Sequence, residues 1–148
     1  MRPLERLVDS RLGQLVTNPL GVFVNTVSDA LNENPQHRAA AMILRRMGHS
    51  RYWRLRKEAA WVIEEQVQPS RDQTELLWAL LRDQHPRVFS RAVLGVIQHA
   101  PHFSRPQLEA GLKLLREANT DGWVFPGGNE AAKRRLISEM ESELNDGG

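Results

Sequence analysis

The sequence contains no cysteine, and this absence excludes disulfide bonds, thiol nucleophiles and thiolate metal sites. Long apolar runs are missing too, since no stretch approaches the roughly 20 apolar residues that a membrane-spanning helix requires. The N-terminal region carries Glu5, Arg6 and Asp9 where a signal peptide would need an unbroken apolar segment. We therefore expect a cytoplasmic protein without a membrane-bound part.

Patterns typical of β-strands are nearly absent. Apolar and polar residues rarely alternate, and no Asn-Gly or Asp-Gly pair joins two β-branched runs. The chain has 148 residues, of which 41% are hydrophobic and 26% charged. That length and composition are typical of one globular domain with its own core. We predict a single all-α domain over residues 1–148.

Motifs for catalysis and cofactor binding are also lacking. The sequence has no HExxH, no glycine-rich phosphate loop and no G-x-S-x-G elbow, and Pro126-Gly127-Gly128 lacks the Lys-Ser/Thr of a nucleotide loop. His99 and His102 are three residues apart, but Pro101 interrupts any helix between them. We expect histidines at helix ends to interact with exposed carbonyl groups, and we predict no catalytic residue, cofactor or metal.

Proline, glycine and asparagine recur between segments with the apolar spacing of a helix. Pro35 and Pro86 suit first turns of helices, and Ser70 and Ser104 suit N-caps. The tail, residues 139–148, is expected to fray. The eight predicted helices cover residues 3–17, 19–32, 36–47, 50–67, 71–83, 86–99, 105–118 and 129–144.

An internal repeat emerges when residues 42–66 are laid over 76–100, at an offset of 34. Met47 then falls on Leu81 and Ala59 on Val93, and apolar positions coincide along both helices of the pair. Helix pairs that recur at this period are typical of an α-solenoid, in which each pair buries its apolar face against its neighbours.

The segment LLWALLRDQHPRVFSRAVLGVI, residues 76–97, resembles a HEAT repeat. The residues that carry the likeness are Leu77, Leu80 and Leu81 in the first helix, Asp83 and Pro86 in the turn, and Val88, Ala92 and Val96 in the second. The family usually has a base directly after that valine, whereas here Phe89 follows and the base comes at Arg91. The preceding helix pair, residues 40–63, is similar but has Ser50 near the place of the turn aspartate.

The resemblance is best over residues 36–100, and the flanks match only as degenerate pairs. It implies a short right-handed α-solenoid of about four HEAT-like hairpins. Such repeats are general scaffolds, so the resemblance implies binding more than any particular activity.

Charge is unevenly distributed along the chain. Residues 34–57 contain seven Arg or Lys and no acid, whereas residues 117–148 contain seven acids and three bases. A helical wheel places Tyr52 and Val62 on the core side of the fourth helix, and Trp53, Lys57 and Ala60 opposite. The repeat register then sets Arg87 and Arg91 beside Trp53 and Lys57. The candidate binding residues are Arg45, Arg46, Arg51, Trp53, Arg54, Lys57, Arg87 and Arg91.

In an α-solenoid, the second helices of successive pairs line the concave face. Three functions suit such a face when it is basic. We favour a non-catalytic module that engages an acidic protein partner; the alternative is DNA or RNA, with phosphates on the guanidinium groups and Trp53 stacked on a base. A remoter alternative is an alkylpurine DNA glycosylase, which HEAT-like repeats also build. The competing interpretation is that these cations merely solvate helix surfaces.

The segment over residues 119–129 is the only long irregular one. It holds Trp123, Val124 and Phe125 among polar residues, glycine and proline. Either these residues fold back as a plug over the end of the domain, or Trp123 and Phe125 form a second partner-binding site. The plug is the favoured interpretation, because an exposed apolar loop promotes aggregation.

Overall fold

The computed structural model describes residues 19–147, and these residues are helical with no strand among them. The helix predicted over residues 3–17 lies outside this range. In the described part, no helix has both the length and the apolar character to cross a membrane. The elements are α3 (Pro19–Glu33), α4 (Arg38–Gly48), α5 (Trp53–Glu64), α6 (Arg71–Leu80), α7 (Pro86–Gln98), the 3-10 helix η1 (Ala100–His102), α8 (Arg105–Glu117) and α9 (Asn129–Asp146).

Capping side chains define most helix starts. Ser70 and Ser104 each accept a hydrogen bond from the backbone N–H three residues later and donate their own backbone N–H to the glutamine side chain there, so both form a capping box. Pro86 is the first residue of α7, as predicted. Pro35 is not in a first turn, because His37 caps α4 by accepting the backbone N–H of Ala40.

Several predicted boundaries are wrong. The helices predicted to end at residues 67 and 83 end at Glu64 and Leu80, and two further boundaries differ for local reasons. The helix expected from residue 50 begins at Trp53, since Ser50 Oγ accepts the backbone N–H of Tyr52 and forms a turn there. The last helix, predicted to end at residue 144, extends to Asp146, and its Met140 and Leu144 side chains are buried.

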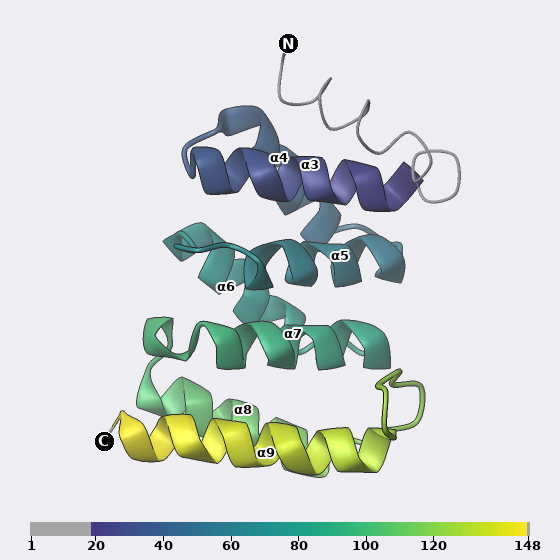
Figure 1. Ribbon diagram of the computed structural model, residues 1–148, viewed down its shortest axis with the longest axis vertical. Coiled ribbons are helices and arrows are strands. Elements are labelled where there is room, and N and C mark those ends of the chain that lie inside the picture. The colour runs from purple at the N-terminus through teal and green to yellow at the C-terminus, as the bar shows by residue number, and fades with distance from the viewer. Residues whose placement is uncertain (1–18, 148) are drawn as a thin grey trace.

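The helices form two rows along the long axis of the molecule (Figure 1). Helices α3, α5, α7 and α9 follow one another in the front row, and α4, α6 and α8 lie behind them. Contacts join each front helix to the next, and they are most extensive between α5 and α7. Residues near the starts of α5 and α7 contact each other, and so do residues near their ends. The two helices are therefore parallel.

Structure repeats along the rows at the period seen in the sequence. Helix α7 begins 33 residues after α5 and ends 34 residues after it. At an offset of 34, buried apolar side chains fall on buried apolar side chains: Met47 on Leu81, Ala59 on Val93 and Val62 on Val96. Equivalent residues thus fill equivalent core positions.

A buried polar side chain bonds a backbone carbonyl at two successive junctions between front helices. Gln66 follows α5, is 4% exposed and donates its side-chain amide to the carbonyl of Ser28 in α3. His99, 33 residues later, is 5% exposed and places Nε2 at 2.8 Å from the carbonyl oxygen of Ile63 in α5. Each buried polar side chain therefore hydrogen-bonds a carbonyl of the preceding front helix and is not left unpaired in the core.

We predict that Leu77→Ala lowers the free energy of unfolding by about 2–5 kcal/mol, because a fully buried leucine loses its contacts and leaves a cavity. Urea denaturation followed by circular dichroism measures the loss. Met42→Ala is the control, since Met42 is 54% exposed and its truncation should change stability by no more than about 0.5 kcal/mol. Equal effects of the two variants would contradict this packing.

Candidate functional site

A tryptophan on α5 gathers three cations from two helices. The charged groups of Arg54, Lys57 and Arg87 lie 5.4, 5.9 and 5.5 Å from the centre of the Trp53 ring. The His85 ring stacks on Trp53 with 4.1 Å between centroids and 9° between planes. We call these five residues the Trp53 cluster. The electron-rich face of an indole attracts cations, so the ring holds like charges close together.

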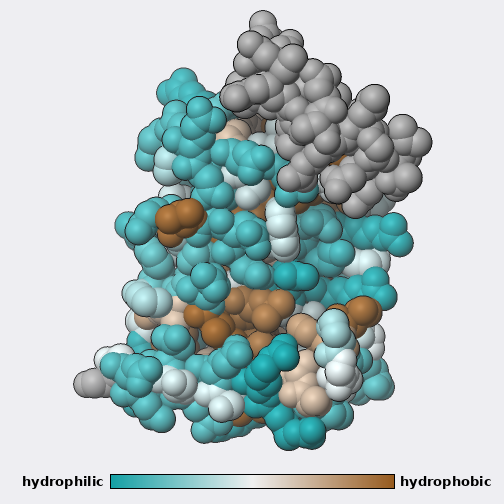
Figure 2. All heavy atoms as spheres, viewed as in Figure 1, coloured by the Kyte–Doolittle hydropathy of each residue, from teal (hydrophilic) through white to brown (hydrophobic). Residues whose placement is uncertain are grey.

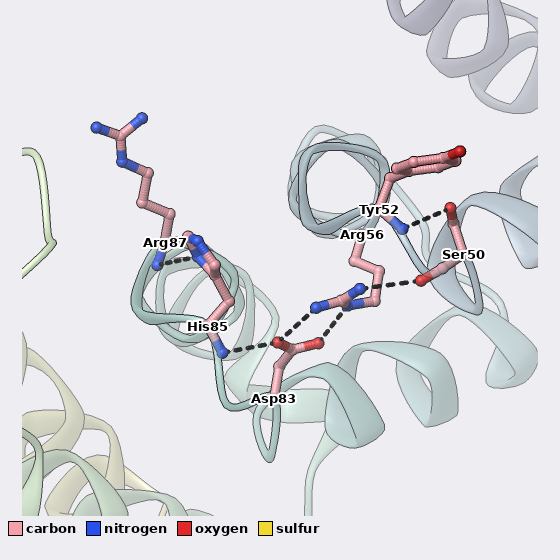
Figure 3. A network of polar contacts seen from close by, with 6 residues as sticks. All are labelled: Ser50, Tyr52, Arg56, Asp83, His85 and Arg87. Atoms are coloured by element: carbon pink, nitrogen blue, oxygen red, sulfur yellow. Dashed lines mark hydrogen bonds and ion pairs between the residues drawn. The ribbon is translucent and has the colours of Figure 1, made fainter.

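A second network fixes the position of this cluster (Figure 3). Arg56 on α5 donates Nε to Asp83 Oδ2 at 2.6 Å and Nη2 to Oδ1 at 3.2 Å, and its Nη1 donates to the Ser50 carbonyl at 3.0 Å. Asp83 Oδ1 also accepts the backbone N–H of His85 at 2.9 Å. Arg56 therefore joins the α4–α5 turn to the α6–α7 turn, and Asp83 orients the backbone of the residue that stacks on Trp53.

The ion pair between Arg56 and Asp83 is largely sheltered, with 21% and 10% of the two side chains exposed. The hydrogen bond to Asp83 raises the pKa of Arg56 above its ordinary value. Bidentate geometry holds the planar guanidinium in one orientation. The pair is a fixed clamp between successive hairpins rather than a loose surface contact.

Several cations at this end of the molecule have no carboxylate partner among residues 19–147. They are Arg51, Arg54 and Arg87, whose contacts are with aromatic rings and, for Arg51, with the Tyr52 hydroxyl. Lys57 by contrast lies 3.3 Å from Glu58. Positive charge that no internal acid neutralises is available to an anionic group outside the molecule.

The predicted binding residues divide into three groups. Trp53, Arg54, Lys57 and Arg87 come together as predicted from the repeat register. Arg91 faces α5 but forms an ion pair with Glu64 at 3.1 Å, so its charge is partly neutralised. The third group is on α4 and the α4–α5 turn, where exposed side chains have no contact with the Trp53 ring among the described interactions; it comprises Arg45, Arg46 and Arg51.

Two wheel assignments on α5 are wrong. Tyr52 is 58% exposed rather than in the core, because it is the N-cap residue and its backbone is extended. Ala60, expected on the outer side, is fully buried because it has neighbours on both sides in a stack of helices. His85 stacks on one face of the Trp53 ring.

Backbone dipoles reinforce the positive charge at this end. Helices α5 and α7 are parallel and both begin beside the Trp53 cluster, so the positive ends of their dipoles lie together. Tyr52 caps α5 without a side-chain hydrogen bond, which leaves amide groups of the first turn unoccupied by a side chain. The field of the backbone and that of the side chains thus have the same sign.

The loop between α8 and α9 acts mainly as a plug. Trp123 is 3% exposed and packs on Phe89 of α7, as expected of a plug, whereas a partner-binding loop would expose its ring. Its Nε1 is buried and has no hydrogen-bond partner among residues 19–147. Phe125 is partly buried against Trp123, and Val124 is 66% exposed. The loop reaches α7 through Gly122, whose positive φ of 86° suits glycine and whose Cα lies against Pro86.

Histidines occupy helix ends, as predicted. His99 contacts the last carbonyls of α5, and His85 Nδ1 accepts the backbone N–H of Arg87 to cap α7. In the part of the chain that the structure describes, no group of three or more His, Asp or Glu side chains could hold a metal ion. The sequence reasoning missed the stacking role of His85 and the clamp between Arg56 and Asp83. The only feature of the sequence that pointed to the clamp was Asp83, the turn aspartate of the repeat pattern.

We predict that Arg56 and Asp83 are energetically coupled. A double-mutant cycle with Arg56→Ala and Asp83→Ala, measured by urea denaturation, should give a coupling energy of about 1–3 kcal/mol, because the bond is charged, bidentate and sheltered. The matched cycle on Arg71 and Glu75, whose side chains are 90% and 62% exposed, should give about 0.3–0.5 kcal/mol. If the two cycles agree, Arg56 is not a clamp.

We predict that Trp123→Ala lowers the free energy of unfolding by about 3–5 kcal/mol, as expected for a buried aromatic side chain. Val124→Ala, next to it and largely exposed, should change stability by at most about 0.5 kcal/mol. Thermal melts of the two variants check this. A Trp123→Ala protein as stable as the parent would show that the loop is not a plug.

Comparison with known proteins yields no relative: no family model matches this chain, and neither a curated protein nor a solved structure matches it.

Proposed function

We propose that this protein is a non-catalytic binding module that engages an acidic partner protein through the Trp53 cluster. The observation that carries the proposal is the convergence of Arg54, Lys57 and Arg87 on one ring, with no carboxylate on Arg54 or Arg87 among the described residues. Holding cations together costs free energy through their mutual repulsion. An acidic group that binds there relieves this repulsion.

The scaffold of the proposal is a right-handed α-solenoid of HEAT-like hairpins, with the front row as its concave face. Support comes from the 33- to 34-residue recurrence of α5 in α7, the matching buried positions and the two equivalent junctions at Gln66 and His99. Asp83 supports it as well, because the aspartate of the turn bonds Arg56 of the preceding hairpin and the backbone of His85. In such a scaffold, the rigid stack presents side chains from successive hairpins to one partner.

A protein partner is favoured over nucleic acid by the state of the tryptophan. Base recognition on single strands relies on open aromatic faces, whereas one face of Trp53 carries His85. Arg56, Lys57 and Arg91 are already paired with carboxylates, which reduces the number of phosphates the face can neutralise. The formal net charge of +2 is also modest for a protein that binds a polyanion.

A glycosylase would need a carboxylate free to act on a flipped base. The acids on α5 and in the α6–α7 turn are Glu58, Glu64 and Asp83, and each forms an ion pair with a neighbouring base. They serve the scaffold in this arrangement. The proposal therefore assigns no catalytic residue to this face.

We predict that the triple variant Arg54→Glu, Lys57→Glu and Arg87→Glu binds a fluorescein-labelled oligoglutamate peptide about 10- to 100-fold more weakly than the parent. Each lost contact contributes up to about 1 kcal/mol at an exposed site, and the introduced acids add repulsion. Fluorescence anisotropy at about 50 and 200 mM salt measures the affinity, which should fall as salt rises.

The control variant carries Arg38→Glu, Lys113→Glu and Arg134→Glu, three exposed positions away from the Trp53 cluster, and it changes net charge equally. It should retain most of the affinity. A loss as large as that of the cluster variant would mean that only overall charge matters. Random duplex DNA and single-stranded RNA are measured in parallel, and tighter binding of either than of oligoglutamate would replace the protein partner by nucleic acid.

A further inference from the structure

The basic residues of α7 share their face with apolar ones. Arg87, Arg91 and Leu94 follow one another at helical spacings of four and three, so they lie on one stripe of α7. Leu94 and the nearby Ile97 are only partly buried. Figure 2 shows a hydrophobic patch over the middle of α7 and on its α9 side, within a face that is otherwise mostly hydrophilic.

The patch and the Trp53 cluster have a fixed separation. Leu94 is seven residues beyond Arg87, which is two helical turns or about 10 Å along the axis of α7. The clamp between Arg56 and Asp83 holds α7 against α5, and the loop held by Trp123 contacts the start of α7. Both parts of the surface therefore belong to one rigid face.

We propose that the acidic partner binds this face as an amphipathic helix with acidic and apolar side chains two turns apart. Its acids contact the Trp53 cluster, and its apolar side chains cover Leu94 and Ile97. The inference rests on the proposed function and goes further, because it specifies which acidic segments bind. The positive charge of the Trp53 cluster favours an acidic segment at one end of the partner helix. The apolar patch on the same stripe favours apolar side chains at its other end.

A helix suits this surface better than an extended segment. An extended segment would set unpaired backbone N–H and C=O groups against Leu94 and Ile97, and the described residues offer no strand edge with which to pair them. A helix satisfies those groups internally and presents side chains every three to four residues. Binding of an amphipathic helix by an apolar helical surface follows the same logic in other recognition modules.

Three labelled peptides of equal length separate the possibilities. The first is a glutamate–leucine helix whose leucines and glutamates lie on one face, two turns apart. The second has the same composition in shuffled order, and the third is oligoglutamate. Fluorescence anisotropy with the full chain should show the first binding at least about fivefold tighter than either control. Circular dichroism should show helix formation of this peptide on binding.

The variant Leu94→Gln should remove the advantage of the amphipathic peptide and leave the affinity for oligoglutamate unchanged, because only the apolar contact is lost. Met42→Gln, on α4 and 54% exposed, is the matched control and should bind all three peptides like the parent. Leu94→Ala repeats the comparison if the glutamine variant unfolds. Thermal melts identify any variant that does so.

The outcomes distinguish the two proposals. If oligoglutamate binds but the amphipathic peptide binds no tighter, or if Leu94→Gln keeps that advantage, the helical partner is wrong and the acidic partner stands. If neither oligoglutamate nor the amphipathic peptide binds at low salt, the proposed function fails and this inference fails with it.

Discussion

The bond between Arg56 and Asp83 is the interaction on which the candidate site depends. It joins one helical hairpin to the next. Arg56 also donates to the carbonyl of Ser50, and Asp83 also accepts the backbone N–H of His85. Two turns that are far apart in sequence thus become one unit. Without this link, α5 and α7 would still pack through their buried residues, but the backbone of His85 would lose its bond to Asp83. Apolar burial stabilises the stack, and the charged clamp makes its register specific.

That register explains how one surface comes to hold several like charges. Arg54 and Lys57 come from α5, whereas Arg87 comes from α7, and each lies within about 6 Å of the same ring centre. The parallel helix starts add their dipoles to the same field. Further along the two helices, Glu64 pairs with Arg91, so the net positive potential is concentrated where the helices begin. The face is therefore polarised along its length, and under the proposed function this polarity would orient a partner as well as attract one.

Helix spacing and repeat period predicted most of this arrangement from sequence. The 34-residue offset placed Trp53 and Lys57 beside Arg87, because stacked equivalent units bring equivalent positions together. It could not distinguish paired from unpaired charge: Arg91 and Arg87 look alike in sequence, and only the structure shows Glu64 beside the former. A helical wheel also misassigned Ala60, since a wheel assumes one buried side and a helix in a stack has several neighbours. Stacking of His85 on Trp53 depends on a turn whose geometry Asp83 determines, which residue spacing does not encode.

The Trp53 cluster and the loop over residues 119–128 differ in how each tryptophan is buried. Both contain a tryptophan beside polar residues in sequence, yet Trp123 is buried on Phe89, whereas Trp53 lies partly exposed among cations. Trp123 leaves its Nε1 without a partner among the described residues, so it stabilises the domain through apolar contact alone. Trp53 uses its π face to hold positive groups that would otherwise repel one another. Trp53 thus lies among Arg54 and Arg87, which have no carboxylate partner among residues 19–147, and the proposed function depends on this combination.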